Sequence, residues 1–276
     1  MKILRNLALA AAAALSLTSA KPVMAQDTQQ ALSSESVIET IKKRGVMKVG
    51  MATFVPWAMR DKNGDLIGFE IDVAKKLAED MGVEAEFVPT AWDGIIPALI
   101  AGKFDVIIGG MSITPARNLT VNFTMPYAHS SLGAMAHIAT SKDIVWPEGY
   151  NSPDVTFSCR RGGSPCDYIK KVFPKATLRL FDDQSQTVQE VLNGNANIML
   201  SSQPLPAFTI YDNPDVVFAP TAELINASNE AFAVRKGDPD ALNFFNNWIL
   251  NNTEGFLAER HAFWFGGRPW ADQVAE

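Results

Sequence analysis

Strands and helices alternate through most of this chain, in two successive blocks. The first block runs from Val46 to Ile108 and the second from Val155 to Leu200. In each block short apolar runs predict strands, and the amphipathic stretches between them predict helices. Such alternation is typical of parallel sheets with helices on their faces. The pattern therefore predicts an α/β protein with two lobes, separated near residues 141–153.

Both blocks have the order strand, helix, strand, helix, strand. The predicted strands are 46–51, 85–88, 104–108, 155–159, 177–181 and 196–200, and the predicted helices are 69–81, 92–101, 165–173 and 185–193. A strand at 231–235 and a helix at 239–252 follow, and we expect them to return to the first lobe because it otherwise lacks covering helices. The expected lobes are 37–134 plus 229–276, and 135–228. Ligands of such sheets lie beyond the carboxyl ends of the strands, so two facing lobes would form a closable cleft.

The first residues have the features of a secretory signal peptide. Lys2 and Arg5 give a basic start, residues 7–17 form an apolar stretch, and small residues precede a cleavage site after Ala25. The stretch is too short to span a membrane. We therefore expect an exported, periplasmic protein that begins with a flexible polar leader over residues 26–36.

The mature chain is acidic. The full sequence has a formal net charge of −6, and removal of Lys2, Arg5 and Lys21 with the signal peptide makes it −9. An acidic, exported chain is a poor candidate for nucleic-acid binding. The three histidines have no metal-ligand spacing, so we expect no metal site.

A strand-to-helix junction in the first block has the features of a carboxylate site. Glycines follow the strand at 104–108, and Thr114 and Pro115 then predict an N-cap and a first helical residue. Arg117 follows in the first helical turn, where free N–H groups, the helix dipole and a guanidinium would converge. The alternative is an ordinary turn with a solvated arginine.

Five stretches together resemble a known family in order and spacing. The chain is similar to the periplasmic solute-binding proteins of the polar amino-acid class, family 3 of the bacterial extracellular solute-binding proteins, the receptors of ABC importers. The resemblance implies a type II periplasmic-binding fold, with two α/β lobes joined by two crossing strands around one amino acid or organic acid. It also implies a membrane permease as partner, a monomer and no cofactor. The stretches are Phe54–Trp57, Gly68–Ala74, Trp92–Leu99, Gly110–Arg117 and Met125–Tyr127.

The resemblance assigns ligand-binding residues in both lobes. Arg117 matches the arginine that binds the ligand's α-carboxylate, and Phe54 matches an aromatic residue that stacks on the ligand. Gly163 and Ser164 resemble the loop that completes the carboxylate site, and Pro165 as first helical residue would make Ser164 an N-cap. The remaining expected site residues are the wall residues Trp57 and Trp92 and the contact residues Gly110, Met111 and Ser112.

One expected ligand contact departs from the family pattern. The position where the family carries an aspartate for the α-ammonium is Ser202 here. A neutral hydroxyl does not balance a buried ammonium, whose burial without a partner costs several kcal/mol. Either the ammonium is held elsewhere, or the ligand is not an ordinary α-amino acid.

The loop between Cys159 and Cys166 leaves two further questions open. The two cysteines form either a disulfide that fixes the loop or a pair of buried thiols. Arg160 and Arg161 either recognise a second acidic group on the ligand or form a solvated pair. Elsewhere, Glu70 and Asp72 lie at a predicted helix start, where we expect a structural role.

Two other functions remain as alternatives to uptake. A few proteins of this fold resemble cyclohexadienyl dehydratases, in which a glutamate three residues beyond the Ser202 position acts as general acid. Leu205 stands there in this chain and cannot transfer a proton, so we expect no enzyme. The other alternative is a receptor that signals through a membrane partner.

Overall fold

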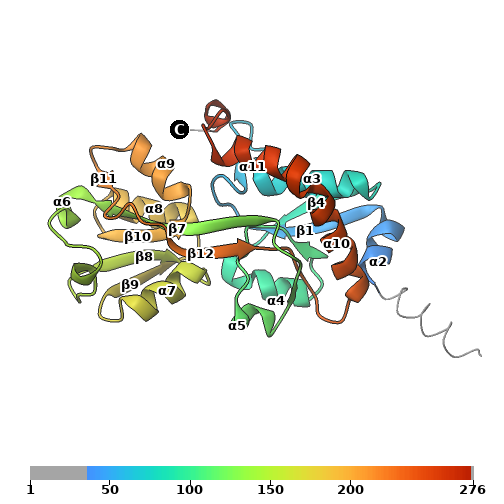
Figure 1. Cartoon of the computed structure of the whole chain (residues 1–276), viewed down its shortest axis with the longest axis horizontal. Helices are drawn as coiled ribbons and strands as arrows, with labels where there is room; N and C mark the ends of the chain where they lie inside the picture. The colour runs from blue at the N-terminus through green and yellow to red at the C-terminus, as the bar shows by residue number, and fades with distance from the viewer. Residues whose placement is uncertain (1–35, 275–276) are drawn as a thin grey trace, which may run out of the picture.

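The computed structural model describes residues 36–274, which form two lobes, each built on its own sheet (Figure 1). The predicted signal peptide and its cleavage site lie outside the described residues. Ser36, the last residue of the predicted leader, is buried and caps helix α2 (Val37–Arg44), and its hydroxyl donates to Asp238. None of the described helices has the length and apolar character that crossing a membrane requires.

The first lobe contains a five-stranded sheet in the order β4-β1-β5-β13-β6. β1 pairs in parallel with β4 and β5, and β13 pairs antiparallel with β5 and β6. The small hairpin β2 (Met59–Arg60) and β3 (Leu66–Ile67) lies beside it. The bounds are β1 Val46–Met51, β4 Glu84–Pro89, β5 Val106–Ile107, β6 Asn122–Phe123 and β13 Ala233–Val234.

The second lobe contains the sheet β11-β7-β10-β8-β9, and β12 pairs with β7 beside this path. β8 pairs in parallel with β9 and β10, whereas β7 pairs antiparallel with β10, β11 and β12. The bounds are β7 Ala128–His137, β8 Thr156–Arg160, β9 Thr177–Phe181, β10 Ile198–Ser202, β11 Val217–Phe218 and β12 Ile225–Glu230.

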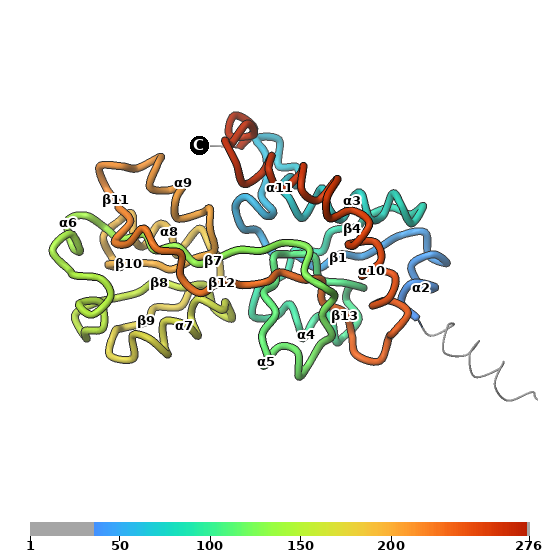
Figure 2. The backbone as a smooth tube through the Cα atoms, in the orientation of Figure 1, coloured from blue at the N-terminus to red at the C-terminus, as the bar shows by residue number. Residues whose placement is uncertain are grey.

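Strands β7 and β12 connect the two lobes (Figure 2). They pair with each other from Ala128–Glu230 to Leu132–Ile225, at the point where the chain passes from one sheet to the other. The side chains of Ser130 and Ser228 both donate to Glu230 Oε1, at 2.8 and 2.6 Å, and tie the two strands together. The alternation pattern alone did not predict either strand.

Helices cover both sheets, and the C-terminal helices pack on the first lobe. Trp248 of α10 donates to Asp80 of α3, and Arg260 and Trp264 of α11 both donate to Asp72, which gives this acidic residue a structural role. The helices of the first lobe are α3 Phe69–Asp80, η1 Trp92–Gly94, α4 Ile95–Ile100, α5 Pro115–Asn118, α10 Pro239–Asn252, the π-helical turn η3 Thr253–Leu257, α11 Ala258–Phe265 and η4 Ala271–Gln273.

The helices of the second lobe surround its sheet on both faces. They are α6 Ile138–Ser141, η2 Glu148–Tyr150, α7 Ser164–Val172, α8 Gln184–Leu192 and α9 Leu205–Asp212. Its core consists of aromatic and aliphatic residues such as Tyr150, Phe157 and Phe173, which are fully or almost fully buried. Other second-lobe residues, Met135, Met199 and Val217 among them, pack in one cluster with the core of the first lobe.

Candidate functional site

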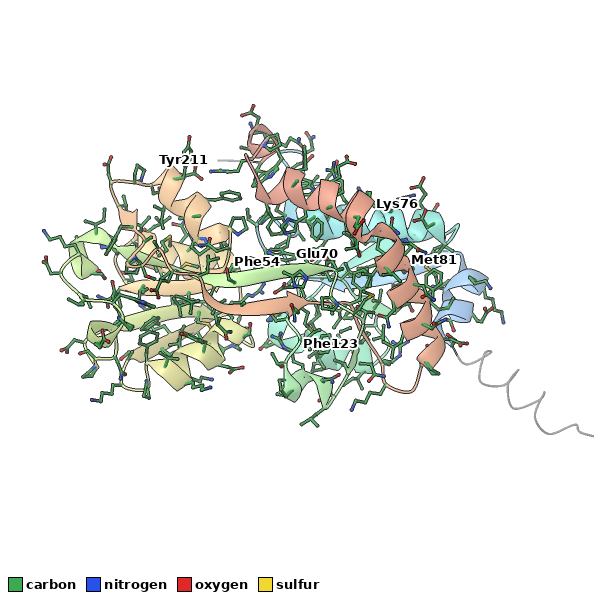
Figure 3. All side chains as sticks on the ribbon, viewed as in Figure 1. Phe54, Glu70, Lys76, Met81, Phe123 and Tyr211 are labelled. Atoms are coloured by element: carbon green, nitrogen blue, oxygen red, sulfur yellow. A yellow bond between two sulfur atoms is a disulfide. The ribbon has the colours of Figure 1, made fainter. Side chains whose placement is uncertain are left out.

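A cavity, partly open to solvent, lies between the lobes at the carboxyl ends of their strands. This is the edge at which open α/β sheets bind ligands. The first lobe lines it with Phe54, Trp92, Gly110, Ser112 and Arg117, and the second with Arg160, Gly163, Ser164, Pro165, Gln184, Leu200, Ser201 and Ser202. Phe54 lies near the middle of the molecule, where the two lobes meet (Figure 3).

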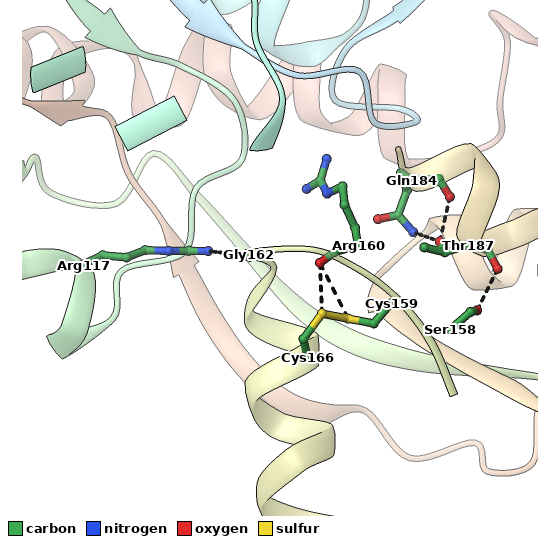
Figure 4. Close-up of a disulfide and its surroundings, with 8 residues drawn as sticks. All are labelled: Arg117, Ser158, Cys159, Arg160, Gly162, Cys166, Gln184 and Thr187. Carbon is green, nitrogen blue, oxygen red and sulfur yellow. Dashed lines mark hydrogen bonds between the residues drawn. A yellow bond between two sulfur atoms is a disulfide. The ribbon is translucent and has the colours of Figure 1, made fainter. Parts of the chain in front are cut away.

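Arg117 lies on α5, just after β5, and contacts both lobes. Thr114 caps this helix as predicted: its hydroxyl accepts from the Arg117 backbone N–H at 3.2 Å. The guanidinium donates to the carbonyl of Ser112 at 2.9 Å and, across the cleft, to that of Gly162 at 3.0 Å (Figure 4). Burial lowers the pKa of Arg117, and nearby Asp167 partly opposes this. Arg117 is thus a partly buried cation held by neutral carbonyls, and a carboxylate would bind this guanidinium more strongly than they do.

Gly110 is fixed by a hydrogen-bonded network behind the cavity. Its φ is +63°, a conformation that favours glycine, and an added Cβ would lie 3.0 Å from the Trp57 ring. Its N–H donates to Tyr127 Oη at 3.1 Å, and that hydroxyl donates to Glu70 Oε1 at 2.5 Å. The Gly110 N–H is therefore already engaged by the protein.

Glu70 lies at the start of α3, as predicted, and is fully buried beneath the site. Burial is the main reason that the pKa of its carboxyl rises to about 8, although Tyr127 opposes the shift. Its second oxygen, Oε2, has no hydrogen-bond partner among the described residues. The raised pKa favours the neutral carboxyl at pH 7, and through Tyr127 the side chain supports the loop that carries Gly110.

The aromatic residues of the first lobe divide between the cavity wall and the core. Phe54 and Trp92 line the cavity. Trp57 is 1% exposed and packs edge-on against Phe69 and Phe265, so it supports the site from behind. Met111 is likewise buried, and neither it nor Trp57 is among the lining residues.

The loop of the second lobe brings backbone and hydroxyl groups to the cavity. Gly163, not Ser164, is the N-cap of α7, so the predicted cap is one residue too late. The reason is that Ser164 already has helical backbone geometry and directs its hydroxyl across the cleft, 3.5 Å from Ser112 Oγ. In this first turn Pro165 has no N–H, and the Cys166 N–H donates to the Gly163 carbonyl at 3.1 Å, so the Ser164 N–H is the amide left for a ligand at this edge of the cavity.

Cys159 and Cys166 form a disulfide, which decides between the two alternatives left open by the sequence (Figure 4). It connects the end of β8 to the first turn of α7, so the loop between them is closed. The two arginines of this loop differ. Arg161 is exposed and donates to Asp182 at 3.0 Å, whereas Arg160 is 9% exposed and lines the cavity.

The cavity is positively charged. Arg117 and Arg160 are its two cations, and its described lining contains no aspartate, glutamate or histidine. Ser202, at the end of β10, contributes a hydroxyl where the family pattern has an aspartate. Among the described residues no group of three or more His, Cys, Asp or Glu is placed to hold a metal ion.

Four lining residues were not among the predicted contacts, besides Arg160, whose role the sequence left open. Gln184 begins α8 directly after β9, and its position beyond a strand end is a signal that could have found it. Pro165 and Ser201 adjoin the predicted residues Ser164 and Ser202, and Leu200 precedes Ser201 on the same strand. Whether Leu200 and Ser201 are exposed to the cavity depends on which face of β10 is turned toward the other lobe.

Two α/β sheets, two connecting strands and a cavity between the lobes define the type II periplasmic-binding-protein fold. Residues 47–267 match the family model of bacterial extracellular solute-binding proteins, family 3, and the chain belongs to this family.

Relatives include both a binding protein and an enzyme. A probable amino-acid ABC transporter-binding protein of Haemophilus influenzae is 36% identical over 238 residues, 83% of this chain and 88% of that protein. Cyclohexadienyl dehydratase of Pseudomonas aeruginosa is 23% identical over 232 residues, 83% and 86% of the two chains. The crystal structure of the ancestral amino acid-binding protein AncCDT-1, a precursor of cyclohexadienyl dehydratase, is 38% identical with a TM-score of 0.75, and the match covers 83% of this chain and 99% of that one.

Proposed function

We propose that this chain captures a small carboxylate-bearing solute, an amino acid or an amino-acid-like acid, and delivers it to an ABC importer. The observation that carries the proposal is the position of Arg117, whose guanidinium contacts carbonyls of both lobes inside the cavity. A carboxylate there accepts two parallel N–H bonds, and charge-assisted bonds of this kind are about twice as strong as neutral ones.

Closure of the lobes completes the binding site in this mechanism. Ser112 and Arg117 come from the first lobe, and Gly163 and Ser164 from the second. A carboxylate held by Arg117 also meets the Ser164 N–H at the start of α7, because helix N-termini favour anions. The hinge is the paired segment of β7 and β12, the connection between the two sheets (Figure 1).

The proposed setting is the periplasm. The basic start, apolar stretch and small-residue cleavage site support export with cleavage after Ala25. The closed form would dock as a monomer on a membrane permease. The sequence similarity of this chain to a probable amino-acid ABC transporter-binding protein supports a permease as partner.

The test is ligand binding by Arg117→Ala. Isothermal titration calorimetry is run with the amino acids and organic acids that raise the melting temperature of the wild-type protein, since a ligand of the native state stabilises it. Removing one partner of a buried charge pair costs about 2–5 kcal/mol, so the variant is expected to bind at least roughly 30-fold more weakly. Asn118→Ala, an exposed residue of the same helix, is the control and keeps full affinity. Unchanged affinity in Arg117→Ala would refute the proposal.

An enzyme is a second candidate, because a cyclohexadienyl dehydratase is among the relatives. The described lining has no carboxyl or imidazole group for general acid catalysis, and Leu205 is a buried apolar residue. These features favour binding without turnover. Incubation with prephenate tests the alternative, and formation of phenylpyruvate would establish the enzyme.

A further inference from the structure

Arg160 is a buried cation that forms no ion pair with the described residues. It ends β8, and its side chain extends from the second lobe toward the first, away from the disulfide (Figure 4). Its guanidinium carbon lies 5.1 Å from the ring centre of Phe54 and 4.4 Å from that of Trp92. Among the described residues its side chain forms no ion pair or hydrogen bond, and Nε is buried without a partner.

Contact with aromatic rings does not satisfy this guanidinium. A ring face attracts a cation by about 0.5–2 kcal/mol, but five N–H donors remain to be paired. Burial is the main reason that the pKa of Arg160 falls to about 9, the neighbouring Arg117 lowers it further, and Asp183 opposes both. Two cations therefore adjoin a cavity whose described lining carries no negative charge.

We infer that Arg160 forms a second anion-binding subsite and that the ligand is a small dicarboxylate without an ammonium group. This inference rests on the proposed function, in which Arg117 binds the first carboxylate. The second carboxylate pairs with the free donors of Arg160 and removes the repulsion between the two arginines. Ser202 supplies a hydroxyl without charge, so an ammonium on the ligand would have no counter-ion from the described lining.

The same geometry excludes ligands with a cationic side chain. The faces of Phe54 and Trp92, which a ligand cation would need for stacking, are already occupied by Arg160. A second cation there would also meet the like charge of Arg160 in a partly enclosed site, where electrostatic repulsion is stronger than in bulk water. L-Lysine and L-arginine are thus expected to bind weakly.

The wild-type protein provides the first test, which needs no variant. Calorimetry compares glutarate, with two carboxylates, with glutaramate, in which one carboxylate of the same carbon chain is replaced by a neutral amide. L-Glutamate tests the effect of an added ammonium, and L-arginine tests a cationic side chain. We expect glutarate to bind at least roughly 10-fold more tightly than each of the other three. Equal or tighter binding of any of them would overturn the inference.

Substitution of Arg160 identifies the subsite itself. Arg160→Gln is expected to lower glutarate affinity roughly 30- to 300-fold with little effect on glutaramate, whereas Arg160→Lys retains part of the preference. Arg161→Gln is the matched control, since Arg161 is exposed and does not line the cavity, and it leaves the preference intact. Circular dichroism and thermal unfolding establish that each variant is folded.

The outcomes separate this inference from the proposed function. If Arg117→Ala abolishes binding while Arg160→Gln leaves the preference for glutarate unchanged, only the second subsite is refuted. If Arg117→Ala binds every probe as well as the wild-type protein does, the proposed function is refuted as well.

Discussion

Replacing Glu70 with glutamine should change how the stability of this protein depends on pH. Burial raises the pKa of this carboxyl from 4.5 to about 8 in the folded protein. In the unfolded chain it ionises near its ordinary value, so the folded state holds one more proton between these two pH values. The contribution of this proton to the free energy of unfolding is therefore fully present below about pH 4.5 and is lost as pH rises toward 8.

The magnitude follows from the size of the pKa shift. One unit of pKa corresponds to about 1.4 kcal/mol, so Glu70 should lower the free energy of unfolding by on the order of 3 kcal/mol between pH 5 and pH 8. Glu70→Gln cannot ionise and keeps an oxygen that accepts from Tyr127. The variant should lose this part of the pH dependence, although its buried amide adds a pH-independent cost of about 1–3 kcal/mol.

Urea unfolding at half-unit steps from pH 5 to 8 measures this difference. The free energy of unfolding of the wild-type protein should fall with rising pH relative to that of Glu70→Gln, and most of this difference should develop below pH 8. Glu223→Gln, which alters an exposed carboxyl in the second lobe, should run parallel to the wild-type protein. If the Glu70→Gln curve also runs parallel to the wild-type curve, Glu70 is not a neutral buried acid.

Two further predictions concern the loops of the site. Replacing both Cys159 and Cys166 with serine opens a short loop and should cost about 2–3 kcal/mol in urea unfolding, and reduced wild-type protein should match the variant; a loss below about 0.5 kcal/mol would contradict this. Gly110→Ala should cost about 1–2 kcal/mol from its positive φ plus a further penalty from the Trp57 ring. Gly102→Ala, at a φ of +72° with open space around it, carries the backbone cost alone, so an equal loss in both variants would exclude the ring contact.

The local sequence determined much of the fold. Apolar periodicity located the strands and helices of both blocks, and helix α10 has the predicted bounds. The residues of strands β7 and β12 were not located by local periodicity, although the resemblance implied two crossing strands, because these strands pair with each other across about 100 residues. The segment Ala128–His137 is rich in small and polar residues, so its own pattern does not distinguish a strand.

The candidate site was predictable to the extent that it depends on local motifs. Thr114 and Arg117 follow from capping rules and chain order, and the structure brings Arg117 to the cavity. The position of Trp57 behind the wall depends on its packing against α11, far along the chain, and the burial of Arg160 depends on how the two lobes meet. No short-range pattern carries that information.

The most direct test of the account is a crystal structure of the protein with its tightest-binding acid. We expect one ligand carboxylate between the lobes, within hydrogen-bond distance of the Arg117 guanidinium and of groups at the start of α7. A ligand bound outside this cavity, or one inside it whose carboxylates contact neither Arg117 nor the second lobe, would contradict it.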